Sequence, residues 1–467
     1  MTQTLVQALA EMVAKTSFDV LPQPVQASAP ERVLDILGLC LAALDLDTST
    51  AALDWVAESG GSPQATAIGL WSQKVPAAQA AFANGVLAHS LDYDDTHLPS
   101  ILHPSASVVP AALAAAETAH AGGERLLAAV ATGVEVVVRL GMAGYDSTAG
   151  QSTFFERGQH ATSICGAIGS AAAAASVLGL DASGIADAMG LAVSMTGGVI
   201  EANRTGGTVK RLHCGWAAHA GVTAAQLAAR GFTGPPTVLE GRFGFYEAFL
   251  SGRYDAAAIT DGLGETWCLP EVHYKPYPAN HFTHAVADAA MALRAAGLRP
   301  EDVESVVIGV PTPTVRTVGE PIEGKRRPLS GYHAKFSAPY VFASALVGGA
   351  GLGLGLDDFT DALVTEPTRQ SLMDRTTVVG SEACDAGYPH ALPAVVTVTT
   401  TDGRTLVESV FANRGGPARP LSADELRAKY LDCASRALGD DAAQRLASAV
   451  LALPAVIDVA DLLEGLS

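Results

Sequence analysis

Apolar residues recur every three to four positions through most of the first 265 residues, which is the spacing of an amphipathic helix. Gly122-Gly123 interrupts the pattern, and Gly231 closes it as a residue that favours a helix C-terminus. Two Gly-rich stretches, 142–158 and 197–213, predict loops. The other connections are short, so the pattern predicts an all-helical body. The expected helices span residues 4–15, 30–45, 75–91, from Ser105 or Ser107 to the diglycine, 124–140, 160–178, 184–196 and 214–230.

The pattern changes near residue 265. The β-branched run 303–311 predicts a strand, and residues 393–411 predict two strands joined by an Asp402-Gly403 turn. These strands alternate with segments of helical spacing, so this part of the chain predicts an α+β domain of ordinary size. The expected helices here span residues 281–296, 333–350 and 357–364.

Helical spacing returns at the end of the chain. Ser422 and Glu425 have the spacing of a capping box, which predicts a helix that runs to about residue 437. The tail 440–465 is helical again, and we expect it to return to the first domain. The predicted fold class is therefore mainly α with an α+β second domain.

Length and charge restrict the class of protein. A chain of 467 residues exceeds one ordinary core, so more than one domain is expected. Its net charge of −19 argues against binding nucleic acid, which needs a basic surface to neutralise phosphates. The six cysteines are scattered without a C-x-x-C pair, which is typical of a protein from the reducing cytosol.

Neither the N-terminus nor the longest uncharged runs predict a membrane segment. The first fifteen residues carry Glu11 and have no apolar core, unlike a signal peptide. The runs 158–180 and 336–356 are long enough to cross a bilayer. The first contains polar residues around His160, and the second is broken by Pro339 and several glycines. We therefore expect two buried segments of a cytoplasmic protein without a membrane partner.

The segment 84–105 concentrates charge in a chain rich in Ala and Gly. A histidine beside a carboxylate is the usual arrangement for proton transfer near neutral pH. A metal site made by His89, Asp92 and His97 is a second interpretation, although H-E-x-x-H is absent. A capping turn between two helices is the third, and the residues alone leave all three open. The segment contains His89, Asp92, Asp94, Asp95, His97 and His103.

Two further stretches suggest an anionic ligand. His160 opens an apolar helix whose free N–H groups and positive dipole end favour an anion. Lys210, Arg211 and His213 lie in an expected loop before a helix. This basic loop suits an anionic substrate, and equally a solvated turn. It lacks the order of a phosphate-binding P-loop, so nucleotide binding is not supported.

The stretch from Tyr274 to His284 lies where the composition changes. Its prolines restrict the backbone, and Lys275, His281 and His284 follow one another closely. A change of domain is a common place for a cleft, so this stretch is a candidate for substrate contacts.

In chain order, these stretches resemble the MmgE/PrpD family, which includes 2-methylcitrate dehydratase, cis-aconitate decarboxylase and iminodisuccinate epimerase. Single motifs of this kind are weak, but the ordered set is specific and covers nearly the whole chain. The motifs are N-G-x-x-A-H-x-L-D-[FY]-D-D-T from Asn84, H-P-S from His103, H-x-T-S from His160, K-R-L-H-x-G-W-A-A from Lys210, K-P-Y-P from Lys275, A-K-F-S-x-P-Y from Ala334 and R-G-G-P-A-R-P-L-S-x-x-E-L from Arg414.

The resemblance implies a large all-helical domain formed by both chain ends, with a smaller α+β lid inserted between them. In this chain the helical domain would comprise residues 1–268 and 414–467, and the lid residues 269–413. It also implies a homodimer that uses no metal or organic cofactor and acts on small di- or tricarboxylates. This weakens the interpretation of segment 84–105 as a metal site.

By matching motifs, the resemblance assigns the site residues of the cis-aconitate decarboxylases to positions in this chain. Lys275 matches a lysine of the lid motif. Where the decarboxylase has a histidine after Pro-Ala, this chain has Asn280 followed by His281. The lid tyrosine is assigned to Tyr332, with Arg211 and His284 as further substrate contacts. The matched positions are Asp92, Thr96, His103, His160 and Lys210.

These residues predict a cofactor-independent lyase, first of all a hydro-lyase similar to 2-methylcitrate dehydratase. His103 would be the main acid or base, His160 the second, and Asp92 would orient a histidine. Lys210 and Lys275 would bind substrate carboxylates. Decarboxylation or epimerisation in the same site is the alternative, and a metal-dependent hydrolase or a ligand-binding protein without catalysis are alternatives from other classes.

Overall fold

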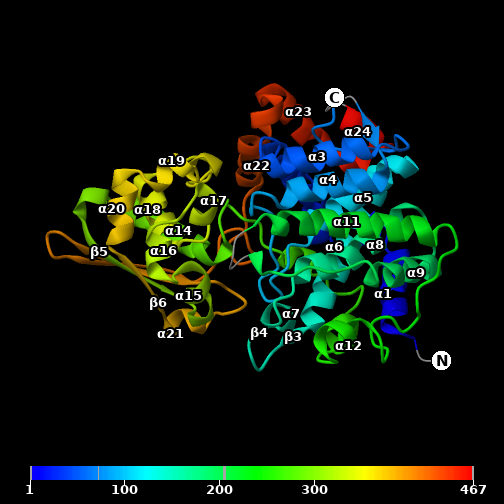
Figure 1. The fold of residues 1–467 in the computed structure, drawn as a ribbon, viewed down its shortest axis with the longest axis horizontal. Helices are drawn as coiled ribbons and strands as arrows, with labels where there is room; N and C mark the ends of the chain where they lie inside the picture. The colour runs from blue at the N-terminus through cyan, green and yellow to red at the C-terminus, as the bar shows by residue number, and fades with distance from the viewer. Residues whose placement is uncertain (1–2, 72, 203–206, 465–467) are drawn as a thin grey trace. The chain divides into compact units, whose positions relative to one another are not determined.

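A computed structural model describes residues 3–71, 73–202 and 207–464. The chain divides into two compact units, Met1–Val272 with Cys433–Ser467 and His273–Asp432. The fold is mainly helical, with a small sheet in the C-terminal part, as the sequence predicts (Figure 1). The boundaries expected from the sequence lie at 268/269 and 413/414.

The first unit is built from helices, with four strands of two residues each between them (Figure 1). The helices are α1 (Leu5–Lys15), α2 (Gln23–Ala42), α3 (Asp47–Ser59), α4 (Ala77–His89), α5 (Ser105–Ala119), α6 (Gly123–Ala143), α7 (Thr153–Glu156), α8 (Ala161–Val177), α9 (Ala182–Val193), α11 (Val209–Ala228), α12 (Phe245–Leu250), α13 (Ala257–Thr260), α23 (Asp440–Leu451) and α24 (Ala460–Glu464). The strands are β1 (Ala65–Thr66), β2 (Lys74–Val75), β3 (Tyr145–Asp146) and β4 (Gln151–Ser152), and 3-10 turns occur at η1 (Phe18–Val20), η2 (Leu269–Glu271) and η6 (Leu453–Ala455).

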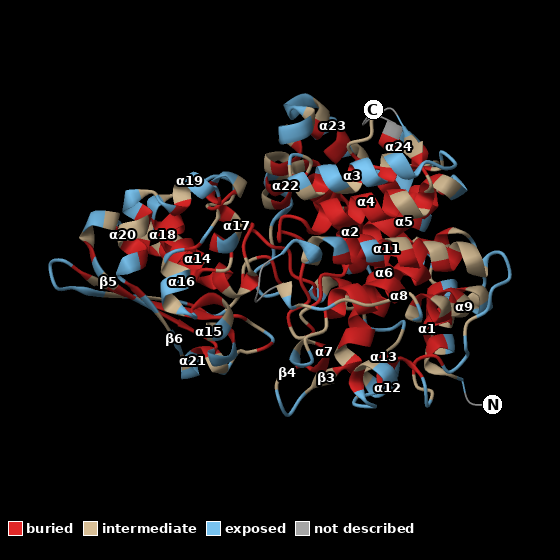
Figure 2. Ribbon diagram, in the orientation of Figure 1, coloured by how far each residue is buried: buried red, intermediate tan, exposed pale blue. Residues whose placement is uncertain are grey.

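Helix α8 lies at the centre of this unit. It packs against α5, α6, α9 and α11, and Ala161–Ala175 is buried throughout (Figure 2). Its side chains are almost all small, which lets the surrounding helices approach it closely. Both chain ends join this core, because α23 packs against α2 and η6 packs against α6. Helix α23 of the C-terminal tail thus packs within the first unit.

The crossing of α4 and α11 depends on two glycines. A Cβ atom at Gly85 would lie 2.8 Å from the Cα of Gly215, and one at Gly215 would lie 2.5 Å from the carbonyl oxygen of Phe82. Only hydrogen fits at both positions, so the two helix backbones touch. This contact sets the end of α4 beside the first turns of α11.

Three expectations for this unit need correction. Helix α2 begins at Gln23, so Pro30 lies inside it; the start signal is Pro22 at the N-cap with Pro24 in the first turn. Helix α11 begins at Val209, so Lys210 and His213 lie on a helix and not in a loop. The loop predicted for residues 197–213 therefore ends before Val209. Residues 142–158, also expected to be a loop, contain β3, β4 and α7.

The second unit contains a four-stranded sheet in the order β6-β5-β7-β8. Its strands are β5 (Val303–Val310), β6 (Thr376–Gly380), β7 (Ala394–Thr400) and β8 (Thr405–Val410). Strands β7 and β8 form the predicted hairpin, with Gly403 at a φ of 84° in the turn. Strand β6 was not expected; it pairs in parallel with β5, and the partner that defines it lies about seventy residues earlier.

Helices α14 and α18 pack together, and α14 contacts β7 and β8 while α18 contacts β6 (Figure 1). The alternating burial along β7 shows that one face of the sheet is covered. Glu425 and Ser422 form the predicted capping box at α22. The remaining elements are η3 (His281–Thr283), α14 (His284–Ala295), η4 (Pro300–Asp302), α15 (Thr312–Val318), α16 (Ile322–Arg326), α17 (Gly331–Ala334), α18 (Ala338–Val347), η5 (Leu356–Asp358), α19 (Asp361–Val364), α20 (Pro367–Asp374), α21 (Glu382–Asp385) and α22 (Ala423–Leu438).

Among the described helices, α6 is long and apolar enough to cross a bilayer, and so is the α2–α3 pair if its 97° bend is counted as one span. The apolar window of α6 is 94% buried inside the protein, where it packs against α8. This is the environment of a core helix. The uncharged runs 158–180 and 336–356 correspond to α8 and α18, which are shorter.

Candidate active site

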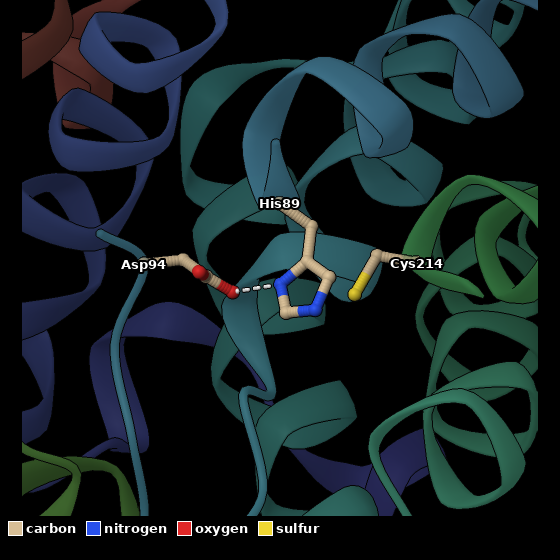
Figure 3. Close-up of side chains that lie close together, drawn as sticks. All are labelled: His89, Asp94 and Cys214. Atoms are coloured by element: carbon tan, nitrogen blue, oxygen red, sulfur yellow. Dashed lines mark hydrogen bonds and ion pairs between the residues drawn. The ribbon is translucent and has the colours of Figure 1, made fainter. Parts of the chain in front are cut away.

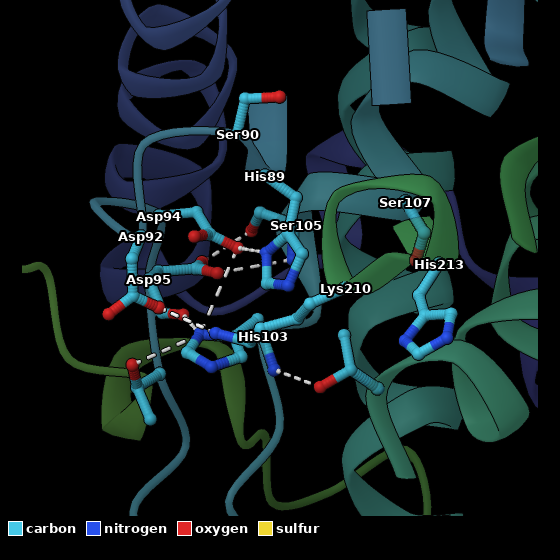
Figure 4. Close-up of polar contacts among 12 residues, drawn as sticks. His89, Ser90, Asp92, Asp94, Asp95, His103, Ser105, Ser107, Lys210 and His213 are labelled. Carbon is cyan, nitrogen blue, oxygen red and sulfur yellow. Dashed lines mark hydrogen bonds and ion pairs between the residues drawn. The ribbon is translucent and has the colours of Figure 1, made fainter. Parts of the chain in front are cut away.

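Four parts of the first unit meet at one buried cluster of polar side chains (Figure 4). They are the end of α4, the loop 90–104, the N-terminus of α8 and the first turns of α11. The Gly85–Gly215 contact brings α4 and α11 together here. The cluster contains His89, Asp92, Asp94, Asp95, Thr96, His103, His160, Lys210 and His213, all of them buried except the partly buried Lys210.

The loop 90–104 has an unusual backbone. Asp92 and Ile101 have φ values of 54° and 56°, a region that side chains other than glycine rarely adopt. A short bridge closes the loop, because the amide of His97 donates to the carbonyl of Leu102 at 2.8 Å and the amide of Leu102 donates to the carbonyl of His97 at 3.3 Å. Strained residues of this kind persist where the surrounding structure holds them, and they concentrate at functional sites.

Asp95 anchors the loop from inside. Its carboxylate accepts bonds from the amide and the hydroxyl of Ser105 and from Arg32 Nη1, at 3.1 Å. Arg32 also donates to the carbonyls of Leu269 and Val272. Burial raises the pKa of Asp95, and Arg32 and Ser105 oppose that rise. The Arg32–Asp95 pair thus connects α2, the loop and the start of α5.

The tautomer of His103 follows from its neighbours. Its Nδ1 lies 2.7 Å from the carbonyl oxygen of Asp95, which can only accept, so Nδ1 carries a proton. Thr96 Oγ1 lies 3.3 Å from the same nitrogen, and Thr162 Oγ1 accepts the backbone amide of His103. When the ring is neutral, Nε2 is therefore the basic nitrogen of His103.

Asp94 is the carboxylate that lies against the histidines. Its Oδ2 is 2.7 Å from His89 Nδ1 and 3.8 Å from His103 Nδ1. All three side chains are nearly or completely buried. The sequence predicts that Asp92 orients a histidine, but it is the carboxylate of Asp94 that lies against the histidines. Asp94 can stabilise a positive charge on either ring.

His160 and His213 form a second pair. His160 is the N-cap residue of α8, as predicted, and its Nδ1 lies 2.8 Å from His213 Nδ1. One ring must donate and the other accept, so one proton lies between them. Burial, then the positive charge of His89, depresses the pKa of both rings, of His160 well below its usual range and of His213 to about 4. Both shifts favour the neutral rings at physiological pH.

Lys210 and Asp92 form an ion pair. Lys210 Nζ lies 2.7 Å from Asp92 Oδ1, and the two side chains are 13% and 2% exposed. Lys210 lies one turn from His213 on α11, so both reach the cluster from the same face of the helix. Arg211 donates to Thr48 at the start of α3. The predicted residues Asp92, Thr96, His103, His160 and Lys210 thus meet, whereas Arg211 contacts α3.

The other predicted substrate contacts lie in the second unit. Lys275 and His284 are 1% exposed, and His284 Nε2 lies 3.0 Å from the carbonyl oxygen of Ala279. His281 stacks on His284 with ring centres 4.4 Å apart. Asn280 Oδ1 accepts the amide of Phe282 and so caps η3. Tyr332 lies on α17 and contacts Phe336.

The described residues contain one group that could offer a metal three ligand atoms: His89, Asp94 and Cys214, all within 4.8 Å of one another (Figure 3). It is not the predicted set of His89, Asp92 and His97. Asp92 is paired with Lys210, and His97 Nδ1 with Ser100 Oγ at 2.7 Å. In the group itself, the Nδ1 side of His89 already faces Asp94, and burial raises the pKa of the Cys214 thiol well above its usual range. The arrangement therefore suits proton transfer better than metal binding.

The sequence singles out His89 only as a candidate metal ligand and Asp94 only as one of the charged residues of segment 84–105, and it does not single out Arg32. The i, i+3 spacing of Lys210 and His213 would have placed His213 beside Lys210 if α11 had been extended to Val209. No local signal identifies Arg32, because its partner lies 63 residues away.

Comparison with known proteins gives a consistent result. Residues 7–257 match the MmgE/PrpD N-terminal domain, and residues 277–454 match the MmgE/PrpD C-terminal domain. Cis-aconitate decarboxylase of Homo sapiens is 32% identical over 394 residues, which cover 81% of this chain and 77% of the relative. The Mus musculus enzyme of the same name is 29% identical and covers 96% and 91%, and that of Aspergillus terreus is 27% identical and covers 85% and 82%. The two matched domains together cover most of the chain, which therefore belongs to the MmgE/PrpD family.

Proposed function

We propose that this protein is a cofactor-independent lyase that acts beside a carboxylate of a small di- or tricarboxylate. The observation that carries the proposal is the buried cluster, in which a histidine paired with a carboxylate, a neutral histidine pair and a lysine lie together. Decarboxylation of cis-aconitate is the first candidate reaction, because the relatives compared above carry that name. Dehydration of a tricarboxylate such as 2-methylcitrate is the second, because Asn280 stands where the decarboxylases have a histidine.

Lys210 is the proposed contact for a substrate carboxylate. Its ammonium group is partly buried and neutralised by Asp92 at 2.7 Å. A carboxylate that approaches Lys210 would share this cation with Asp92, in a charge-assisted hydrogen bond that is stronger than a neutral one. The same cation would stabilise negative charge that develops on the substrate during the reaction.

His103 is the proposed group that moves the proton. Its Nδ1–H is held by the carbonyl of Asp95, so Nε2 can accept or deliver a proton. Asp94 lies 3.8 Å from Nδ1 and stabilises the charged ring. In decarboxylation, the C–C bond to the departing carboxylate breaks, CO₂ leaves, and the carbanion takes a proton from the charged ring. In dehydration, the neutral ring removes a proton from carbon before hydroxide leaves.

His160 would contact the substrate as a neutral ring. Its low pKa excludes a charged acid at neutral pH, but a neutral ring can donate one hydrogen bond through its N–H. It lies at the N-terminus of α8, where an anion is favoured. Thr96, beside His103, and Lys275, His284 and Tyr332 of the second unit are the further proposed substrate contacts.

The test is a panel of substrates. Purified protein is incubated with cis-aconitate, 2-methylcitrate, citrate and iminodisuccinate, and CO₂ release and alkene absorbance are followed, before and after treatment with EDTA. We expect turnover of one of these acids that survives EDTA. Activity that is lost with EDTA and returns with a divalent metal would instead support a metal-dependent hydrolase. Absence of turnover with an intact fold would contradict the proposal.

The assembly is also a proposal. The first unit would be the helical domain and the second a lid over it, in a cytoplasmic homodimer that involves neither nucleic acid nor a membrane. One apolar stripe supports the homodimer: Val209, Leu212 and Trp216 of α11 are 40%, 40% and 43% exposed at helical spacing. Sedimentation analysis of Trp216→Glu tests this. If the variant forms a dimer as stable as that of the wild type, the apolar stripe is not part of the dimer interface.

A further inference from the structure

His89 lies at the centre of the histidine cluster. Its ring centre is 5.2 Å from that of His103 and 5.7 Å from that of His160. It is 2% exposed, and its Nδ1 is held by Asp94. Its Nε2 is buried and has no hydrogen-bond partner among the described residues. A buried imidazole held on one side only is unusual for a residue that merely fills space.

Asp94 is shared between two rings. One carboxylate oxygen lies 2.7 Å from His89 and 3.8 Å from His103. A single negative charge can balance one imidazolium in this buried space, and a second positive charge would be repelled by the first. The ring that is charged must therefore be one of the two that face Asp94.

The His160–His213 pair lies on the other side of His89. Its rings are 4.8 Å apart, and His160 faces His89. The charged and titratable groups around the pair come from α4, the loop before α5, and α11. They are His89, Asp92, Asp94, Asp95, His103, Lys210 and Cys214. On α6, Glu135 and Arg139 bind each other and the segment 259–268 instead.

We propose that His89 is a positioning residue that acts through Asp94: the single positive charge of the cluster stays beside this carboxylate, on His89 or His103, and the His160–His213 pair stays neutral. The proposal deepens the proposed function and rests on it for its effect on turnover. His89 would keep an acid available on the His103 side and a neutral hydrogen-bond donor on the His160 side. The two histidine pairs, His89 with His103 and His160 with His213, would thus have different roles.

The test is His89→Asn. The asparagine amide can replace Nδ1–H as a donor to Asp94, but it carries no charge. Imidazole ¹³C and ¹⁵N resonances of the full chain are followed from pH 3 to 8, with His160 and His213 assigned by substitution. In the wild type we expect both rings to be neutral at pH 7, with one imidazolium beside Asp94. In His89→Asn the charge beside Asp94 can no longer lie on a ring whose centre is 5.7 Å from that of His160, so we expect His160 and His213 to titrate about one to two pH units higher.

The control is His219→Asn, which removes a histidine of α11 that stacks on Trp216. It should leave the titration of His160 and His213 unchanged. Unchanged titration in a folded His89→Asn would overturn the proposal. If that variant fails to fold, a charged His160–His213 pair in the wild type at pH 7 would overturn it instead. If a substrate is turned over, the acidic limb of the plot of kcat/KM against pH should lie at higher pH in His89→Asn, by the same number of pH units. If the wild type turns over no substrate, that result contradicts the proposed function and not this inference.

Discussion

The Arg32–Asp95 ion pair offers a sharp test of how the site is held. Both side chains are buried, at 2% and 1% exposure, and the contact measures 3.1 Å. Arg32→Met removes the charge, keeps most of the apolar volume, and leaves a carboxylate inside the first unit. The carbonyls of Leu269 and Val272 lose a donor at the same time.

The magnitude follows from the distance. Two unit charges 3.1 Å apart attract by about 5 kcal/mol at an effective dielectric constant of roughly 20. Removing one partner of a buried pair costs about 3–5 kcal/mol in free energy of unfolding. The bonds from Ser105 remain and Asp95 can take up a proton, so we expect about 3 kcal/mol at pH 7.

The loss should depend on pH. The pKa of Asp95 is raised by burial, and Arg32 opposes that rise, so removing Arg32 raises it further. A carboxyl whose folded-state pKa lies above its unfolded value stabilises the fold at low pH, and this stability is lost as pH rises through the folded-state pKa. The difference between Arg32→Met and the wild type should therefore be largest near neutral pH and shrink as the pH falls.

Tryptophan fluorescence during urea unfolding measures the free energy of unfolding of the first unit, which contains the Arg32–Asp95 pair. All four tryptophans, at positions 55, 71, 216 and 267, belong to the first unit. Arg253→Met is the matched control, because its pair with Glu156 is 48% and 43% exposed and should be worth less than about 1 kcal/mol. When Arg32→Met is combined with Asp95→Asn, the loss in free energy of unfolding should be smaller than in Arg32→Met alone. An equal loss in single and double variants, or one no larger than in the control, would refute the reasoning.

His103→Ala should leave folding intact and lower kcat about 10²–10⁴-fold, whereas alanine at His120, whose side chain is 76% exposed, should change neither. Lys210→Met should weaken substrate binding, with KM raised about 10–100-fold for the loss of one charge-assisted hydrogen bond; an unchanged KM would remove Lys210 from the binding site. Gly215→Ala should cost about 1–3 kcal/mol in urea unfolding, because its methyl group would lie 2.5 Å from the carbonyl oxygen of Phe82, while Gly197→Ala, which meets no atom within 4 Å, should cost far less.

Much of the fold follows from local signals. The helical period located most long helices of the first unit to within a few residues, but α2 begins at Gln23 and not at residue 30, and α3 was not predicted. The Asp402-Gly403 turn predicted the β7–β8 hairpin. Strand β6 could not be predicted from local signals, because its parallel partner β5 is remote in sequence. The predicted start of α11 at residue 214 lies five residues too late, because nearby glycines suggest a loop, although Thr208 directly precedes the helix.

The sequence by itself predicted most of the side chains that meet in the candidate site and gave the order in which they occur. Its motifs predict that Asp92, Thr96, His103 and Lys210 belong to one site. It could not determine their pairing. Asp92 and Asp94 lie two positions apart, and only the tertiary structure directs one to Lys210 and the other to His89.

The physical reason is that a pairing of charges depends on backbone direction and burial, which neither composition nor spacing encodes. A left-handed residue at Asp92 and the contact of α4 with α11 at Gly85 set the directions of the side chains. Burial in a space with few compensating charges then decides which histidines stay neutral. Several residues of the candidate site could thus be predicted from the chain, but their pairing and their protonation states depend on the fold.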